Sequence, residues 1–240
     1  MEEAVKLNNG IKLTWLGHGT FTTEFEGQIC LIDPWVASNP VCPDALKTFD
    51  KLDVMLITHG HADHTADAVD LAKQHSPTVV AMIEVSTWLA SKGVENTIGM
   101  NKGGTVSVDG LHATMVTANH SSSFTEEDGT IVYLGEPAGF ILEFSNGYKI
   151  YHAGDTNVFG DLRIIGEIYQ PDLALLPIGD HFTMGPREAA YAAQLLNVPA
   201  IVPMHYGTFP LLTGTPDALR ELTKDQAVEI VELQLGETLD

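Results

Sequence analysis

The feature that most constrains this chain is a group of imidazole and carboxylate side chains directly after a short apolar run. The segment Leu56–Val69 reads LITHGHADHTADAV and overlaps the apolar residues VMLI. A near-continuous apolar run predicts a central strand buried on both faces, and residues Ala66–His75 that follow have helical spacing. We therefore expect a buried strand that ends in a polar cluster and leads into a helix.

Four residues of this cluster are of kinds that bind metals, namely His59, His61, Asp63 and His64. His59 and His61 are two apart, so in extended backbone their side chains point to the same side and can chelate one ion. Imidazole with carboxylate is a ligand set for Zn²⁺ and neighbouring first-row metals. One histidine at a strand end would more often be a solvated loop residue, but four such residues together carry repulsion and desolvation costs. The cluster therefore predicts a metal site.

Length and order of elements predict one domain with two sheets. The chain has 240 residues, 44% of them hydrophobic, and no long Pro/Gly/Ser linker, so we expect a single domain over residues 1–240. Residues 11–35 alternate apolar and polar on both sides of Glu26-Gly27-Gln28, which predicts an antiparallel hairpin that ends at Asp33. Short strands follow, and the second half alternates helices with strands. Two packed sheets with helices outside are expected.

Charge and cysteine content favour a soluble cytoplasmic protein. Lys and Arg number 12 against 32 Asp and Glu, and the formal net charge of -20 disfavours nucleic acid as a partner. No apolar run approaches the ~20 residues of a membrane span. Cys30 and Cys42 are the only cysteines, and the opening MEEAVKLNNG lacks a charged-then-apolar leader. We expect both thiols to be reduced and to serve packing alone.

Further residues of kinds that bind metals follow other apolar strands. His120 stands in TANHSS, Asp155 in YHAGDTN and His205 in VPMHYG. If these strands share a sheet edge, their loops converge on the cluster. The irregular stretch Asn119–Gly139 is longer than most connections, which favours a functional loop.

The order of these motifs resembles the metallo-β-lactamase superfamily over nearly the whole chain. The segments WLGHGTF, NHSSSF, GEPAGF, HAGDT, FTMGP and MHYGTFP are similar to a branch of small metal-dependent hydrolases that includes the ascorbate-6-phosphate lactonase. The resemblance implies an α/β fold, a four-layer αββα sandwich with the metals at a sheet edge. It also implies two divalent ions, with Zn²⁺ favoured by the histidine-rich ligands and Mn²⁺, Fe²⁺ or Ni²⁺ as alternatives.

The resemblance also implies a role for each ligand. One ion would be held by three histidines, His59, His61 and His120. The other would be held by Asp63, His64 and His205, and Asp155 would bridge the two ions. Asp33, in LIDPW, would accept a hydrogen bond that fixes a ligand imidazole; the alternative is a turn residue that ends its strand before Pro34.

Such a centre implies hydrolysis by a metal-bridging hydroxide, because bound metal lowers the pKa of water from ~15.7 to about 7. The expected substrate is a small ester, lactone or phosphorylated metabolite, and Asp63 would also pass a proton. His18 and His181 follow apolar strands and are candidate proton donors or oxyanion contacts, with exposed or capping histidine as the alternative. For His152 we favour packing or support of the site.

The pocket is expected to be closed by two segments. Residues Gly179–Pro186, which include His181, would form one wall and residues Ser123–Gly139 the other, with Glu126, Glu127 and Asp128 near the rim. Shape and charge would then exclude polynucleotides.

Two rival functions share parts of this pattern. An RNA or DNA phosphodiesterase would use the same dinuclear site, but the acidic charge and lack of an inserted domain weigh against it. A redox protein of the flavodiiron type would need a further carboxylate ligand and a flavin domain. The lactonase-like branch also implies self-association into a homo-oligomer.

Overall fold

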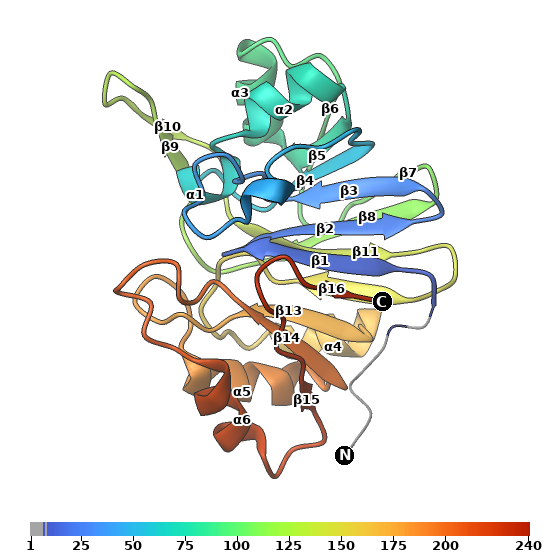
Figure 1. The fold of residues 1–240 in the computed structure, drawn as a ribbon, viewed down its shortest axis with the longest axis vertical. Coiled ribbons are helices and arrows are strands. Elements are labelled where there is room, and N and C mark those ends of the chain that lie inside the picture. Colours follow the sequence, from blue (N-terminus) through green and yellow to red (C-terminus); the bar gives the residue numbers. More distant parts are fainter. Residues whose placement is uncertain (1–6, 8) are drawn as a thin grey trace.

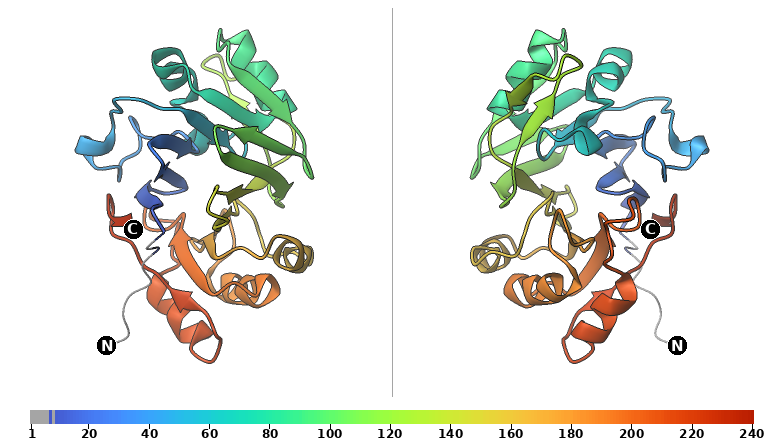
Figure 2. Two further views of the ribbon diagram at one scale, coloured as in Figure 1. Left: turned by 90° about the vertical axis from the view of Figure 1, so that its right-hand side faces the viewer. Right: turned by 90° about the vertical axis from the view of Figure 1, so that its left-hand side faces the viewer.

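The fold is a sandwich of two seven-stranded sheets with helices on both outer faces. The computed structural model describes residue 7 and residues 9–240. Figure 1 shows the sheets in the middle of the molecule, with one group of helices above them and a second group below. The side views in Figure 2 show the same layers. The predicted four-layer αββα architecture is confirmed.

The first sheet has an antiparallel half and a parallel half. Strands pair antiparallel from β16 to β3 and parallel from β3 to β6. In spatial order the strands are β16 (Thr238–Leu239), β1 (Lys12–Gly17), β2 (Thr20–Phe25), β3 (Gln28–Ile32), β4 (Val54–Ile57), β5 (Thr78–Met82) and β6 (Thr97–Met100).

The second sheet repeats this plan. Its parallel half runs from β15 to β12 and its antiparallel half from β12 to β7. In spatial order the strands are β15 (Glu229–Ile230), β14 (Ala200–Met204), β13 (Leu173–Pro177), β12 (Lys149–His152), β11 (Ala138–Glu143), β8 (Leu111–Thr117) and β7 (Thr105–Val108).

Helices cover the parallel halves. Beside the first sheet lie α1 (Ala62–Thr65), α2 (Ala68–His75) and α3 (Ile83–Ser91), and beside the second lie α4 (Leu162–Tyr169), α5 (Pro186–Leu196) and α6 (Pro216–Thr223). A short 3₁₀ turn, η1, spans Asp44–Leu46. The longest helix, α5, has 11 residues. None of the helices in the described part of the chain has the length and apolar character that crossing a bilayer requires.

Two details differ from the sequence expectations. The segment predicted as one hairpin forms three strands, because the chain also turns at His18 and Gly19 between β1 and β2. The stretch Asn119–Gly139, expected to be irregular, contains a separate hairpin of β9 (Ser123–Thr125) and β10 (Ile131–Tyr133). This hairpin projects from the body of the molecule at the upper left of Figure 1.

A candidate metal centre

All seven predicted ligands lie at one edge of the sandwich. His59 and His61 follow β4, and His120, Asp155 and His205 follow β8, β12 and β14. The strands β8, β12 and β14 point the same way in the second sheet. Their carboxyl ends therefore meet at one edge, which is where ligands bind in sheets of this kind.

Asp155 occupies the centre of the cluster. Its Oδ2 atom lies 3.0 Å from Nε2 of His205, 3.3 Å from that of His64, 3.7 Å from that of His120 and 3.9 Å from that of His59. The preceding residue, Gly154, has φ 61°, and a Cβ there would lie 2.5 Å from a backbone carbonyl oxygen. Only glycine fits this turn, so Gly154 fixes where the Asp155 carboxylate points.

The remaining ligands form two groups around Asp155. Ligand atoms of His59, His61 and His120 lie within 4.8 Å of one another, and so do those of a second group, His18, Asp63, His64 and His205. These groups match the two ligand sets that the resemblance implies, with His18 as an addition to the second.

Several buried polar atoms in the cluster have no hydrogen-bond partner in the described part of the chain. They are Nε2 of His64, both ring nitrogens of His205 and Oδ1 of Asp155. A buried polar atom without a partner costs free energy, and proteins keep few of them. All four atoms belong to residues with metal-binding groups, so the donor set fits divalent metal ions.

Asp33 sets the orientation of two candidate ligand imidazoles. Its Oδ2 atom lies 2.8 Å from Nδ1 of His64, and the hydroxyl of Thr58 donates to the same oxygen at 2.7 Å. Nδ1 of His59 lies 3.0 Å from that hydroxyl, so its N–H donates to Thr58. Both rings therefore carry their proton on Nδ1 and present Nε2 to the metal site. The predicted supporting role of Asp33 agrees with this geometry, although φ 52° also places it at a turn.

Burial and the opposite charges of the cluster shift its pKa values in opposite directions. Burial favours the neutral form of His59 and lowers its pKa well below the ordinary value. Burial acts the same way on His64, but Asp155 and Asp33 outweigh it and raise the pKa of His64. Burial alone would raise the pKa of Asp155, yet His205 and His64 hold it well below its usual range. Asp155 is therefore an anion throughout the physiological range.

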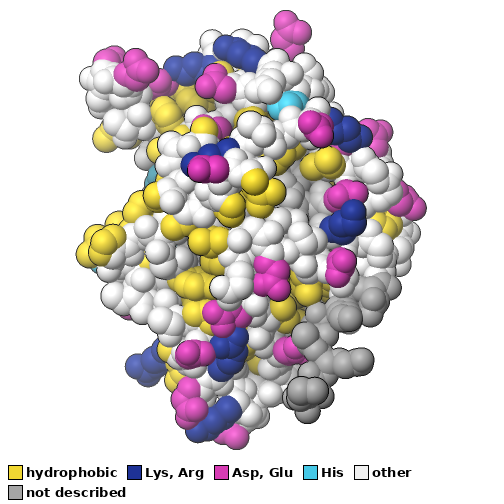
Figure 3. All heavy atoms as spheres, viewed as in Figure 1, with side chains coloured by type: hydrophobic (Ala, Val, Ile, Leu, Met, Phe, Trp, Pro, Cys, Tyr) yellow, Lys and Arg dark blue, Asp and Glu magenta, His cyan; other side chains and the backbone are white. Residues whose placement is uncertain are grey.

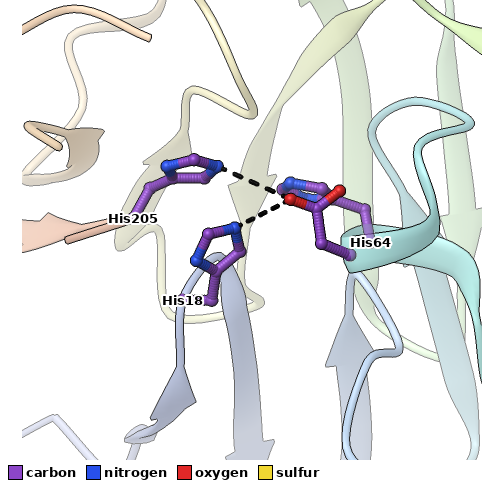
Figure 4. Close-up of side chains that lie close together, drawn as sticks. His18, His64 and His205 are labelled. Atoms are coloured by element: carbon purple, nitrogen blue, oxygen red, sulfur yellow. Dashed lines mark hydrogen bonds and ion pairs between the residues drawn. The ribbon is translucent and has the colours of Figure 1, made fainter. Parts of the chain in front are cut away.

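His18 holds the Asp63 carboxylate in place. Nε2 of His18 lies 3.0 Å from Oδ2 of Asp63, and Nδ1 lies 3.0 Å from the hydroxyl of Thr208. Dashed lines in Figure 4 run from His18 and from His205 to one carboxylate oxygen, since Nε2 of His205 also lies 4.0 Å from Oδ2 of Asp63. Burial lowers the pKa of His18 to about 4. The neutral ring therefore donates from Nε2 to Asp63 and accepts from Thr208.

The backbone of the site is strained at His18 and at His205. His18 has φ 57° and His205 has φ 56°, in the left-handed region that side chains rarely adopt. The N–H of His205 donates to the His18 carbonyl oxygen at 3.0 Å, and the indole of Trp15 donates to the same oxygen. These bonds tie the β1–β2 turn to the end of β14 and link the two sheets at the site.

His152 supports the site from the core. Its Nε2–H donates to the Gly19 carbonyl oxygen at 2.9 Å, and its Nδ1 accepts from the N–H of Gly154 at 3.1 Å. His152 is fully buried and connects the β1–β2 turn to the loop that carries Asp155. This agrees with the packing or supporting role favoured by the sequence.

His181 stands apart from the cluster. It is exposed in the loop between β13 and α5, has φ 58°, and its ring lies against that of Phe182. The catalytic role predicted for His181 stays a prediction.

The acidic residues of the β9–β10 turn do not line the centre. Glu126 accepts from the indole N–H of Trp88 at 2.9 Å and from the ammonium of Lys92 at 2.8 Å. Glu127 and Asp128 border the same surface hollow beside α3. Figure 3 shows acidic side chains gathered on this projection at the upper left. Because the hairpin leans on α3, the expectation that these residues guard the rim was wrong.

A pocket of about 560 Å³ opens onto the centre. Its polar floor is formed by His61, Asp63, His120, Ser121 and Asp155, and its walls by Phe182, Phe209, Pro210 and Leu211. Phe182 lies in the Gly179–Pro186 segment that was predicted as a wall, whereas sequence reasoning did not single out the other wall residues, Thr58 or Thr208. FTMGP contains Phe182, and MHYGTFP contains Thr208, Phe209 and Pro210, but a sequence motif does not tell which side chain faces a pocket.

Comparisons with known proteins agree with this geometry. The family model described as a β-lactamase superfamily domain matches residues 29–206. A UPF0173 metal-dependent hydrolase from Koribacter versatilis is 53% identical over 95% of this chain and 97% of its own length. One from Methanopyrus kandleri is 44% identical over 96% of this chain and 100% of its own.

A solved structure is also similar. A metallo hydrolase from the hyperthermophilic archaeon Ignicoccus hospitalis superposes with a TM-score of 0.83 and 36% identity, covering 95% of this chain and 97% of its own. The chain therefore belongs to the metallo-β-lactamase superfamily and, within it, to the UPF0173 family of metal-dependent hydrolases.

Proposed function

We propose that this chain is a single-domain dinuclear hydrolase that cleaves a small-molecule ester, lactone or phosphoester. The observation that carries the proposal is the position of Asp155, whose carboxylate lies between two groups of metal-binding side chains at the floor of a pocket. One continuous hydrophobic core across both sheets supports a single domain. The lactone option follows the lactonase-like motifs.

Each side chain of the centre has a separable task. His59, His61 and His120 would hold one ion, Asp63, His64 and His205 the other, and Asp155 would contact both. Divalent ions bound there supply Lewis acidity, which lowers the pKa of water and polarises a carbonyl or phosphoryl oxygen.

The other residues orient these ligands or move protons. Asp33 and Thr58 fix the two imidazoles that they contact, and His18 fixes the carboxylate of Asp63. Asp63 lines the pocket. Burial alone would raise the pKa of Asp63, but the hydrogen bond from His18 and the nearby His64 together outweigh burial and keep that pKa below the usual range. The ionised carboxylate can accept a proton from water and return it to a leaving group.

The donor set supports Zn²⁺ as the resident ion, with Mn²⁺, Fe²⁺ or Ni²⁺ as alternatives, because imidazole and carboxylate suit all four.

A nuclease would need cations to hold a phosphate backbone, and none of the described residues that line the pocket is Lys or Arg. Two free, buried cysteines support a reducing, cytoplasmic location. Self-association is proposed from the lactonase-like motifs alone.

The test is reconstitution of metal-stripped protein ion by ion. Elemental analysis should find two ions per chain, and hydrolysis of model esters, lactones or phosphodiesters should return only with metal. Full activity after chelation would overturn the proposal, and so would efficient cleavage of single-stranded RNA with no activity on any small substrate.

A further inference from the structure

The pocket above the metal centre has two unlike halves. Its floor consists of the metal-binding and neighbouring polar side chains, and its walls are formed by Phe182, Phe209, Pro210 and Leu211. A substrate whose scissile bond lies on the floor must therefore place its remaining atoms against apolar side chains.

The walls leave large apolar side chains exposed to water. Phe182 is 49% exposed and Leu211 is 53% exposed. Leaving apolar area in water costs roughly 25 cal/mol per Å², and a ligand that covers these side chains recovers that free energy. Exposed apolar surface around a polar site is typical of a binding pocket.

Phe209 is held in a fixed position. Its ring lies 5.4 Å from that of His18, edge on, and 6.0 Å from that of Trp35, measured between centroids. The N–H of Leu212 donates to the Phe209 carbonyl oxygen, which closes the turn that carries Pro210 and Leu211. This wall is therefore built before a ligand arrives, and little ordering is needed on binding.

The charges of the pocket disfavour an anionic substituent. Asp63 and Asp155 would be neutralised by the metal ions that they hold, and away from the floor the described lining contains no Lys or Arg. A phosphate or carboxylate remote from the scissile bond would find no cation, in a protein of net charge -20.

From these observations we infer that the substrate is uncharged and apolar beyond its scissile bond, such as an alkyl or aryl ester or lactone, and that Phe182, Phe209 and Leu211 select it. The inference rests on the proposed hydrolase function and narrows its substrate class. It sets aside a phosphorylated metabolite, which the sequence had left open.

The first experiment measures binding rather than turnover. Alkyl hydroxamates carry a metal-chelating head group, so calorimetry on the zinc-loaded protein can compare acetohydroxamate, pentanohydroxamate and octanohydroxamate. Affinity should rise with chain length, by up to roughly fourfold for each methylene that reaches the wall. Leu211→Ser should reduce this gain, while Ile168→Ser should keep it. Ile168 is a matched control because it is 65% exposed on α4, outside the pocket.

The second experiment tests charge. Succinic monohydroxamate has a carboxylate where pentanohydroxamate has an apolar end, and the unaltered protein should bind it at least tenfold more weakly. Leu211→Lys should narrow or reverse that preference by supplying the absent cation, and Ile168→Lys should not.

The two proposals fail in different ways. Affinity that is independent of chain length, a preference for the anionic probe, or no effect of Leu211→Ser would overturn the inference even if esters are hydrolysed. No binding of any hydroxamate would overturn it as well. Chain-length dependence without metal-dependent hydrolysis of any ester, lactone or phosphoester would leave the inference standing and overturn the proposed function.

Discussion

Asp155 is the residue on which the centre most depends. It is 2% exposed and lies close to imidazoles of both ligand groups. Asp155→Ala should abolish hydrolysis and lower the bound metal below two ions per chain, because two cations at the usual separation of about 3.5 to 4 Å would lose their shared anion. The fold should persist, since Asp155 follows β12 in a loop.

Circular dichroism, elemental analysis and turnover measure these three effects. Asp225→Asn is the matched control, because Asp225 is exposed after α6 and lies outside the pocket lining. Wild-type turnover in Asp155→Ala would remove the residue from the site.

The effects of Asp33 on His64 and on His59 can be measured separately, because only the second depends on Thr58. Asp33 accepts directly from His64 but reaches His59 only through the Thr58 hydroxyl. Asp33→Asn should weaken metal binding roughly 10- to 100-fold, the usual cost of losing a partner that orients a ligand. Thr58→Val should weaken it less, because His64 keeps its acceptor.

Metal titration followed by elemental analysis distinguishes the two variants. Thr223→Val serves as the control, since Thr223 is also a buried threonine but donates to a backbone oxygen within α6. Equal losses in Thr58→Val and Thr223→Val would show that the Thr58 effect is not specific to the site.

At the scale of elements, the β9–β10 hairpin is anchored rather than poised over the pocket. Glu126 bonds Trp88 and Lys92 of the α3 region, and the exposed fractions of Ile131 and Tyr133 are 72% and 68%. Glu126→Gln should loosen the hairpin and speed proteolytic nicking near Asp128 and Gly129, because exposed loop tips with few contacts are cut first. Turnover should not change.

Limited proteolysis and steady-state kinetics on the same samples test whether the hairpin loosens without a change in turnover. Glu127→Gln is the control, since Glu127 is exposed at the same turn and Glu126 makes the bonds to α3. A large loss of kcat in Glu126→Gln would show that the acidic turn acts at the pocket rim after all.

Elements with strong local signals were predicted well. Residues 186–196 form α5, in the half of the chain that was expected to alternate helices with strands, because Pro186 starts the helix and Asn197 ends it in the left-handed conformation. The strand β6 and the two-residue β16 had no such signal. β6 pairs with the preceding strand β5, whereas β16 depends on an edge that the distant strand β1 offers. The β9–β10 hairpin was missed because its strands have three residues each.

In the candidate site, too, residues with a strong local signal were predicted and residues that depend on tertiary contacts were not. Histidine and aspartate at strand ends are rare enough to predict a cluster, and parallel pairing explains why they meet. Thr58, Thr208 and Phe209 are ordinary residue types whose roles depend on tertiary contacts. The sequence therefore predicted which histidines and aspartates gather at this edge, whereas the partners that orient them and most of the pocket wall required the structure.

At the scale of the whole molecule, the buried histidines make stability depend on pH. Burial lowers the pKa of His18 to about 4 and lowers those of His59 and His152 below the ordinary 6.5. These groups stay neutral in the folded protein and take up protons when it unfolds. Their contribution is fully present above pH 6.5 and is lost as pH falls through the lowered pKa of each group, which for His18 is about 4. His64 acts oppositely, because its pKa is raised and its contribution is lost as pH rises.

Histidines with a lowered pKa, which also include His61 and His120, outnumber the one with a raised pKa, so metal-stripped protein should lose stability as pH falls from 7.5 to 5. Each buried histidine adds at most about 1.4 kcal/mol per pH unit to the slope. His152→Asn should be less stable throughout, having lost the bond to Gly19, but its stability should fall less steeply because asparagine takes up no proton. His112→Asn, at an exposed position on β8, should keep the full slope. Urea midpoints at each pH measure these differences. A midpoint that rises towards pH 5, or equal slopes in His152→Asn and the unaltered protein, would show that the buried imidazoles do not control acid stability.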